Sequence, residues 1–404
     1  MLIKLAWRNI WRNKRRSIIV IGSVIVGVVA LIFMDGLNNG FISQMLFNQV
    51  NLNISHIQIH KKGFNDNKVI QSFIPDKGKV EHVLLNNNKV KHFSERVVAF
   101  GLVSSAISSS GVFILGINPD DESKITTISK SIIKGKYFTG KKREIVIGNK
   151  LAEKLKVDLG GKVIALSNRP DGSIGSEVFR IVGIFRSPSS EFNKAYIFVP
   201  IKTLQNMLGI GDKIHEFAII TNDYNVTEVV KNEIRQKLNG NYEVLSYRDI
   251  LPLLIMQMEL YKETMYIINL IIGLALIFGI INSMLMAVFE RINEIGVLMA
   301  IGMKNGKIFI MILLESLLIG LLGTAFGLIT GIGLTEIISI NGIDFSLFAK
   351  SLESWGIGAV IYPKLTLENL IATLLMIPFI TVAGAIYPAW KAIKLEPVYA
   401  IRYV

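Results

Sequence analysis

The chain has 404 residues, 51% of them hydrophobic, and it contains no cysteine. A disulfide framework, cysteine-ligated zinc and thiol catalysis are therefore excluded. The net charge of +13 is in the range of nucleic-acid-binding proteins, but much of the positive charge collects beside apolar segments. We therefore expect no nucleic-acid partner.

The first element expected is an amphipathic helix over residues 1–16. One face carries tryptophan and aliphatic side chains, and the opposite face carries arginines. Such a basic helix lies in the membrane interface, with its tryptophans at the depth of the lipid headgroups. We expect it to contact membrane lipids through an interfacial anchor made of Trp7, Arg8, Trp11 and Arg12.

Residues 17–39 form an apolar segment long enough to cross a hydrocarbon core of ~30 Å. The following region, 40–260, has short apolar runs separated by turn signals, which predicts a mixed α/β domain. The strand-like runs are densest over about 112–200, which predicts a β-rich subdomain inserted into the α/β fold. The expected strands are 54–59, 112–117, 144–147, 162–166, 178–184 and 196–199, and the expected helices are 80–85, 149–156 and 227–238.

Three more apolar segments of spanning length follow in quick succession. They cover 261–290, 307–336 and 368–391, and they are separated by a short 291–306 segment and a 337–367 loop. The fold class expected is a membrane protein with four transmembrane helices and a large mixed α/β extracytoplasmic domain between helices 1 and 2.

Lysine and arginine collect before the first span, between the second and third spans, and in the 392–404 tail. By the positive-inside rule these parts are cytoplasmic, and the 40–260 domain and the 337–367 loop are extracytoplasmic. We also expect Gly323, Gly327 and Gly331, which recur every four residues, to allow close helix packing, within the chain by default or else at a dimer face.

Few residues suggest chemistry. Residues 135–141 have the spacing of a phosphate-binding loop, but Lys142 stands where a serine or threonine would hold magnesium. The histidines lack a third nearby ligand, so we expect no catalytic residue, no metal site and no cofactor on this chain. Asp35, Glu315 and Glu336 are ionisable residues at or near membrane depth, and such residues are candidates for function.

The segment from Glu290 to Gly302 reads ERINEIGVLMAIG. With Leu5–Asn9 (LAWRN) and the ending that begins at Tyr387 (YPAWKA), it resembles the permease family that includes FtsX, MacB and the lipoprotein-releasing LolC and LolE. The stretches LGINP at 115–119 and EIVIGNKLA at 144–152 are similar to the external domain of LolC, LolE and MacB. The resemblance implies a MacB-like periplasmic core in a bacterial inner-membrane protein.

The same resemblance implies an ABC transporter permease that is coupled mechanically to a separate LolD-like ATPase dimer, which would hold the ATP and Mg. MacB carries its ATPase before the first span, where this chain leaves no room for it, and FtsX has a smaller external domain. The lipoprotein-releasing type is therefore the nearest match. It implies a lipoprotein substrate, a second permease subunit, identical or homologous, and a LolA-like periplasmic carrier. FtsX-like signalling to an extracytoplasmic partner and MacB-like export of another substrate remain alternatives.

The 291–306 segment corresponds in this family to a cytoplasmic coupling helix that transmits movement from the ATPase. The residues assigned to this role are Glu290, Arg291, Glu294, Gly296, Leu298 and Gly302. In LolC a long hook between two external strands recruits the carrier, and the matching connection here, 167–177, is short. Acyl chains are expected to enter between the first two spans. The residues assigned to this path by helical phase are Val24, Val28, Ile268 and Ile272.

Overall fold

The structure is a computed structural model that describes residues 2–12, 14–238 and 240–394, so residues 395–404 of the predicted tail lie outside the described residues. The chain divides into two compact units. We call residues 1–43, 257–345 and 360–404 the helical unit, and residues 44–256 and 346–359 the sheet unit.

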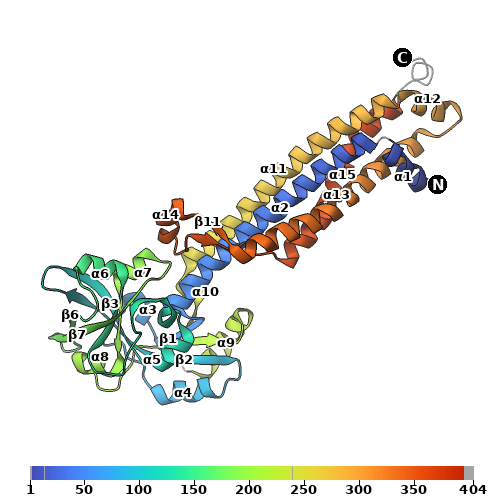
Figure 1. Ribbon diagram of the computed structural model, residues 1–404. Coiled ribbons are helices and arrows are strands. Elements are labelled where there is room, and N and C mark those ends of the chain that lie inside the picture. The colour runs from blue at the N-terminus through green and yellow to red at the C-terminus, as the bar shows by residue number, and fades with distance from the viewer. Residues whose placement is uncertain (1, 13, 239, 395–404) are drawn as a thin grey trace. The chain divides into compact units, whose positions relative to one another are not determined.

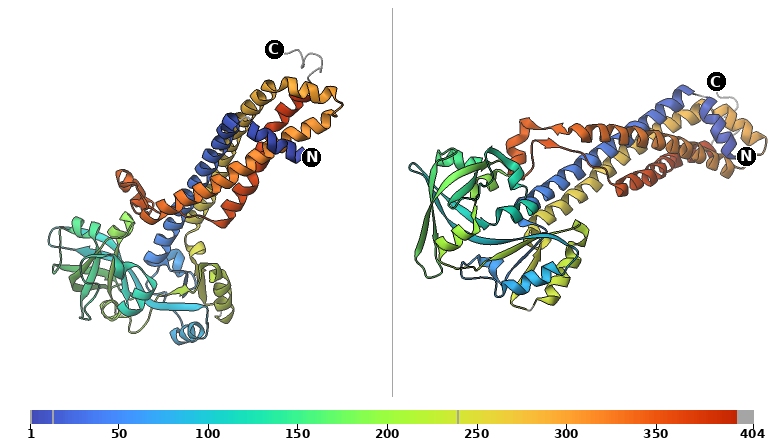
Figure 2. Two further views of the ribbon diagram at one scale, coloured as in Figure 1. Left: turned by 45° about the vertical axis from the view of Figure 1, so that its right-hand side comes forward. Right: turned by 60° about the horizontal axis from the view of Figure 1, so that its bottom comes forward.

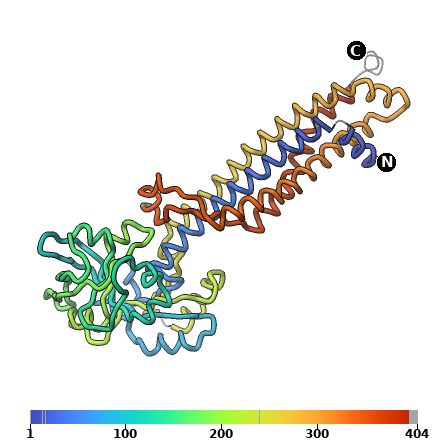
Figure 3. Tube along the Cα trace, in the orientation of Figure 1, coloured from blue at the N-terminus to red at the C-terminus, as the bar shows by residue number. Residues whose placement is uncertain are grey.

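Four helices are long and apolar enough to cross a membrane. They are α2 (Lys14–Gln49), α11 (Pro252–Glu290), α13 (Asn305–Asn341) and α15 (Leu367–Ile393). The short helices α1 (Leu2–Arg12) and α12 (Ile292–Ala300) lie at the same end of the helical unit (Figures 1 and 3). Each long helix extends past its predicted span, because the apolar pattern marks the part that suits hydrocarbon and not the helical turns beyond it.

The glycines of α13 pack against α2 of the same chain. A Cβ added at Gly323 would lie 2.6 Å from Val24 Cγ1, and one added at Gly327 would lie 2.6 Å from Val28 Cβ. On the α15 side, the Ser316 hydroxyl donates a 2.6 Å hydrogen bond to the Thr381 carbonyl. The expectation of close packing within the chain is confirmed, because small residues let these helices approach.

The predicted 337–367 loop contains short elements. Strand β11 (Ile343–Asp344) pairs with β12 (Val360–Ile361) in the helical unit, and α14 (Ala349–Ser354) belongs to the sheet unit. The amide of Lys364 donates a 2.8 Å hydrogen bond to the carbonyl of Gly36, so the chain before α15 is held against α2.

The sheet unit is built on one sheet of ten strands. They are β1 (Ile57–Lys61), β2 (Val90–Ser104), β3 (Ser109–Ile117), β4 (Ile132–Gly135), β5 (Glu144–Gly148), β6 (Lys162–Asn168), β7 (Ile174–Phe185), β8 (Tyr196–Pro200), β9 (Glu216–Thr221) and β10 (Tyr242–Ser246). The order is β10-β1-β9-β2-β3-β8-β5-β7-β4, and β6 pairs with β2 and β7. The mixed α/β domain is confirmed.

Strand β2 corrects the predicted division of this domain. Strands β3 to β8 all lie within 109–200, as the predicted subdomain over 112–200 requires, but they do not form a separate sheet. The 15-residue β2 pairs with β9 along its first half and with β3 and β6 along its second half. One long strand thus joins both halves through continuous backbone hydrogen bonds.

Helices complete the sheet unit. They are α3 (Phe64–Asn67), α4 (Lys77–Leu85), α5 (Pro119–Ile125), α6 (Asn149–Leu155), α7 (Ser190–Ala195), α8 (Ile201–Leu208), α9 (Thr227–Lys237) and α10 (Tyr247–Ile250). Helices α4 and α9 lie side by side (Figure 2). Val80 of α4 and Val230 of α9 are fully buried in the same apolar core, so these helices close one part of the sheet from water.

A buried charge cluster lies in the sheet unit. The fully buried Arg96 guanidinium donates 2.7 Å hydrogen bonds to carboxylate oxygens of Glu122 and Glu216. His60 Nε2 lies 3.1 Å from the other Glu216 oxygen. Burial opposes ionisation of Glu216, but Arg96 outweighs it and lowers the pKa of Glu216 to about 2.

Candidate coupling site

Helix α12 is the predicted coupling helix. It spans nine residues, Ile292–Ala300, and α13 begins at Asn305, so the helical part is shorter than the predicted 291–306 segment. The helix is shorter because a turn at Gly302 ends it. Gly302 has a φ of +92°, a conformation that glycine adopts without steric cost and that no helix continues through.

This turn is a Schellman motif. The amide of Gly302 donates to the carbonyl of Met299, and the amide of Met303 donates to the carbonyl of Leu298, each at 3.0 Å. This pair of hydrogen bonds, with a left-handed glycine after the last helical residue, satisfies carbonyls that the helix end leaves free. Gly302 thus forms a left-handed cap at the end of α12.

Ion pairs tie α12 to two other helices. Glu294 pairs with Arg12 of α1 and, at 3.1 Å, with Arg291. Arg291 also pairs at 3.2 Å with Glu315 of α13. Partial burial opposes ionisation of Glu294, but the two arginines outweigh it and hold the pKa of its carboxyl below the usual range.

The Arg291–Glu315 pair is the better shielded one. The side chains are 14% and 3% exposed, whereas those of Arg12 and Glu294 are 51% and 45% exposed. A solvated pair contributes little, but removing one partner of a buried pair leaves an uncompensated charge. Glu315, singled out as a costly residue in an apolar span, is therefore matched by Arg291.

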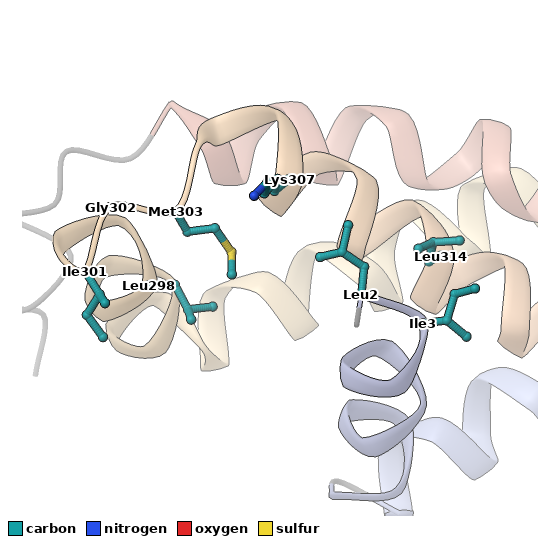
Figure 4. Close-up of a pocket in the computed structure, with 8 residues that line it drawn as sticks. All are labelled: Leu2, Ile3, Leu298, Ile301, Gly302, Met303, Lys307 and Leu314. Atoms are coloured by element: carbon teal, nitrogen blue, oxygen red, sulfur yellow. The ribbon is translucent and has the colours of Figure 1, made fainter.

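An apolar cavity of about 650 Å³ lies between α1, α12 and α13 (Figure 4). Its lining residues are Leu2, Ile3, Leu298, Ile301, Gly302, Met303, Lys307 and Leu314. Two predicted coupling residues, Leu298 and Gly302, lie in its wall. Gly296 is buried on α12, and Glu290 lies exposed at the end of α11. The predicted coupling residues thus surround one junction of four helices.

The predicted interfacial anchor occupies α1. Trp7 and Trp11 are 44% and 43% exposed and their rings meet edge to face, 5.9 Å apart. Arg8 and Arg12 are also exposed. On the opposite side, Ile10 is fully buried and packs in one cluster with Ile319 of α13. Helix α1 therefore packs on the bundle with one face and presents its aromatic and basic side chains outward.

The assignment of the substrate path needs correction. Val24 and Val28 are fully buried, and both face the glycines of α13 described above, so they line no path between α2 and α11. Ile268 and Ile272 of α11 are only partly buried. The exposed face of α2 carries Val26 instead, which is 69% exposed.

Sequence reasoning missed the links from α12 to Arg12 and Glu315. A signal for one of them was present, because a single acidic residue in an apolar span requires a basic partner, and Arg291 is a basic residue in the short segment that precedes this span. No comparable signal connects Arg12 to Glu294. Their pairing depends on how α1 folds back along α13, which the pattern of α1 alone does not fix.

Four spanning helices, with an α/β domain between the first and second, define a multi-pass membrane protein with one large external domain. Two family models match the chain. "FtsX-like permease C-terminal" covers residues 266–397, and "MacB-like periplasmic core domain" covers residues 17–237, more than half of the sequence. The chain belongs to the FtsX/MacB family of ABC transporter permeases, and it is a multi-pass inner-membrane protein with a periplasmic domain.

Relatives in this family carry different names. The chain is 25% identical over 300 residues to the lipoprotein-releasing system transmembrane protein LolC of Xylella fastidiosa, covering 71% of this chain and 72% of that one. It is 25% identical over 406 residues to LolC of Buchnera aphidicola, covering 98% and 96%. It is 24% identical over 414 residues to the macrolide export ATP-binding/permease protein MacB of Acinetobacter baylyi, covering 96% of this chain but 57% of that protein.

Proposed function

We propose that this chain is the permease subunit of an ABC transporter that extracts lipoproteins from the inner membrane for transfer toward the outer membrane. The energy would come from a separate LolD-like ATPase dimer, which holds the ATP and Mg. The similarity to LolC over nearly the whole chain supports this substrate class.

One observation carries the mechanical part of the proposal. The ion pairs of Arg12, Arg291, Glu294 and Glu315 connect α12 with both α1 and α13. A partner that pushes on α12 therefore acts mainly on α13, through the shielded Arg291–Glu315 pair, and more weakly on α1, through the exposed Arg12–Glu294 pair. In this arrangement α12 is the point where an ATPase would transmit its movement to the permease.

The proposed orientation places α1, α12 and the chain's end in the cytoplasm and the sheet unit in the periplasm. The distribution of lysine and arginine supports it. A second permease subunit, identical or homologous, would complete the transporter, since an ATPase dimer presents two equivalent docking surfaces.

A LolA-like carrier is proposed to receive the lipoprotein, by contacts other than a long hook. Strands β6 and β7 pair up to Asn168 and Ile174, and the residues between them form a tight turn. In this turn the amide of Arg169 donates to the carbonyl of Ser173 at 2.7 Å, and the amide of Gly172 donates to the carbonyl of Arg169 at 3.0 Å. Such a closed hairpin is too short to wrap a partner.

MacB-like export of another substrate is the second candidate, because the similarity to MacB also covers nearly the whole chain. FtsX-like signalling to an extracytoplasmic partner is the third. Release of a lipoprotein distinguishes the first from both.

The test is reconstitution of the chain with the ABC ATPase that co-purifies with it, in proteoliposomes loaded with a labelled lipoprotein. We expect ATP-dependent transfer of the label to soluble LolA-like carrier. A matched ATPase variant without hydrolysis should abolish it. Active hydrolysis without lipoprotein release would contradict the proposal and favour export of another substrate or signalling.

A further inference from the structure

A second cavity lies at the ends of α2, α11 and α15 that are nearest in sequence to the sheet unit. It has a volume of about 220 Å³ and, unlike the cavity at α12, it is lined mainly by polar side chains. They include Asp35, Lys262, Asn269 and Glu368. All of them belong to the helical unit. The volume is below the ~300 Å³ at which pockets for drug-sized ligands begin, so the cavity suits a headgroup and not an acyl chain.

Asp35 stands out in this cavity because it is buried without a matching cation. It is 7% exposed, and it accepts one long hydrogen bond of 3.5 Å from Asn269 Nδ2. Among the described residues, no basic group lies within 4 Å of its carboxylate. An ionised carboxylate removed from water is strongly destabilising without a partner of opposite charge, and its alternative is the neutral, protonated form.

Asn269 provides an independent indication of a ligand. Its Oδ1 atom is buried and has no hydrogen-bond partner. With Asp35 ionised, turning the amide around would not solve this, because Oδ1 would then face the carboxylate and both atoms are acceptors. Buried polar atoms are rarely left unpaired. The cavity therefore contains one acceptor without a donor, on α11, beside a buried carboxylate on α2 whose hydrogen bond from Asn269 is long.

The charged residues at the rim do not supply it. Lys262 and Glu368 both line the cavity and are exposed. Together with Asp35 they give the cavity two carboxylates and one ammonium, so its formal balance is negative. A group with N–H donors and a positive charge would satisfy both the Asp35 carboxylate and Asn269 Oδ1.

We propose that this cavity binds the primary ammonium group of a membrane-anchored lipid or lipoprotein, with the Asp35 carboxylate and Asn269 Oδ1 as acceptors. The inference rests on the proposed function for its substrate class. An ammonium has three N–H donors and one charge, which matches two acceptors of which one is ionised. An N-acylated amine has lost the charge, and a quaternary ammonium has lost the donors. Two molecules offer the required chemistry: a diacylated lipoprotein with a free α-amine, and phosphatidylethanolamine.

The experiment measures binding to the full chain, purified in mild detergent without its ATPase. The probe is a fluorescent diacylglyceryl-cysteine lipopeptide with a free α-amine, and its matched partner has the same amine acetylated. Phosphatidylethanolamine and phosphatidylcholine are used as competitors. The variants are Asp35→Asn, which removes the charge at constant shape, Asp35→Glu, which retains it, and Glu336→Gln as the control. Glu336 is an exposed carboxylate of α13 that does not line the cavity.

We expect the free-amine probe to bind roughly tenfold to a hundredfold more tightly than the acetylated one, as for a charge-assisted hydrogen bond. Asp35→Asn should remove this preference, while Asp35→Glu and Glu336→Gln should retain most of it. If phosphatidylethanolamine displaces the probe and phosphatidylcholine does not, the phospholipid headgroup shares the site, and the ammonium assignment stands. If phosphatidylethanolamine alone binds through Asp35, the ammonium site again stands and the lipoprotein is not its ligand.

Equal binding of the two probes, with no effect of phosphatidylethanolamine, would overturn the assignment, as would an Asp35→Asn variant that keeps the full preference. An unfolded variant is recognised because it loses binding of both probes, and Asn269→Leu, which removes the unpaired acceptor, then serves as the second test with the same expected loss of preference. Since no ATPase is present, this outcome is independent of whether lipoprotein release succeeds in proteoliposomes.

Discussion

Alanine substitutions at the glycines of α13 test how α2 packs against this helix. At Gly327 an added Cβ would lie 2.6 Å from Val28 Cβ, a branch point that no side-chain rotation can move. The helices must therefore separate. Overpacking of this kind costs about 1–3 kcal/mol, which exceeds the gain of roughly 0.5–1 kcal/mol when alanine replaces glycine within a helix.

Two neighbouring glycines are matched controls. At Gly331 the closest atom would be Ile32 Cδ1, at 2.9 Å, which is the end of a flexible side chain that can turn away. At Gly333 no atom lies within 4 Å of an added Cβ. We expect Gly333→Ala to be neutral or stabilising, Gly331→Ala to have a small effect and Gly327→Ala to destabilise by about 1–2 kcal/mol net.

The measurement is thermal unfolding of the purified full chain in one mild detergent, followed by the helical signal. The ranking of the three variants decides the question, because detergent and purification affect them equally. If Gly327→Ala unfolds at the same temperature as Gly333→Ala, α2 does not pack on α13 in this way, and the correction of the substrate path fails with it.

Four further predictions concern coupling, pH, ATP and the substrate path. Glu294→Lys should leave the ATPase bound but uncouple lipoprotein release, while Asn293→Lys on the exposed side of α12 should have little effect. The pKa of Glu216 is lowered from its ordinary value of 4.5 to about 2 in the folded chain. Ionised Glu216 therefore stabilises the fold above pH 4.5, and this contribution is lost as the pH falls toward 2. Thermal unfolding of the Glu216→Gln variant should depend less on pH between these two values. The purified chain alone should hydrolyse no ATP, and turnover that disappears with Lys141→Ala would contradict this. A photocrosslinker at Val26 should capture lipoprotein, and one at Val28 should capture α13.

The sequence predicted the fold well where one simple pattern decides it. Long apolar segments predict the spanning helices, because in lipid the backbone must satisfy its own hydrogen bonds. The strands found in the external domain were mostly those with short apolar runs. Strand β2 was missed because its 15 residues carry serine, glycine, lysine and arginine among the apolar ones. Strands β9 and β10 were missed as well, and β9, the neighbour of β2 in the sheet, is far from it in sequence. Pairing between distant segments decides β2, whereas β9 contains the apolar run 217–220, a local signal from which a strand could have been predicted.

The site was predicted less evenly, and α2 shows why. An apolar, β-branched helix face suits acyl chains and a neighbouring helix equally well, so helical phase alone left Val24 and Val28 open to either role. The partner decides it. On α13 a glycine lies opposite each of these valines. A branched side chain packed against a glycine makes contacts at least as close as those that a lipid chain would make. These valine–glycine contacts hold α2 and α13 together. Under the proposed function, a path for acyl chains runs along the other face of α2, where Val26 is 69% exposed, and substrate would enter without opening the contact that holds the two helices together.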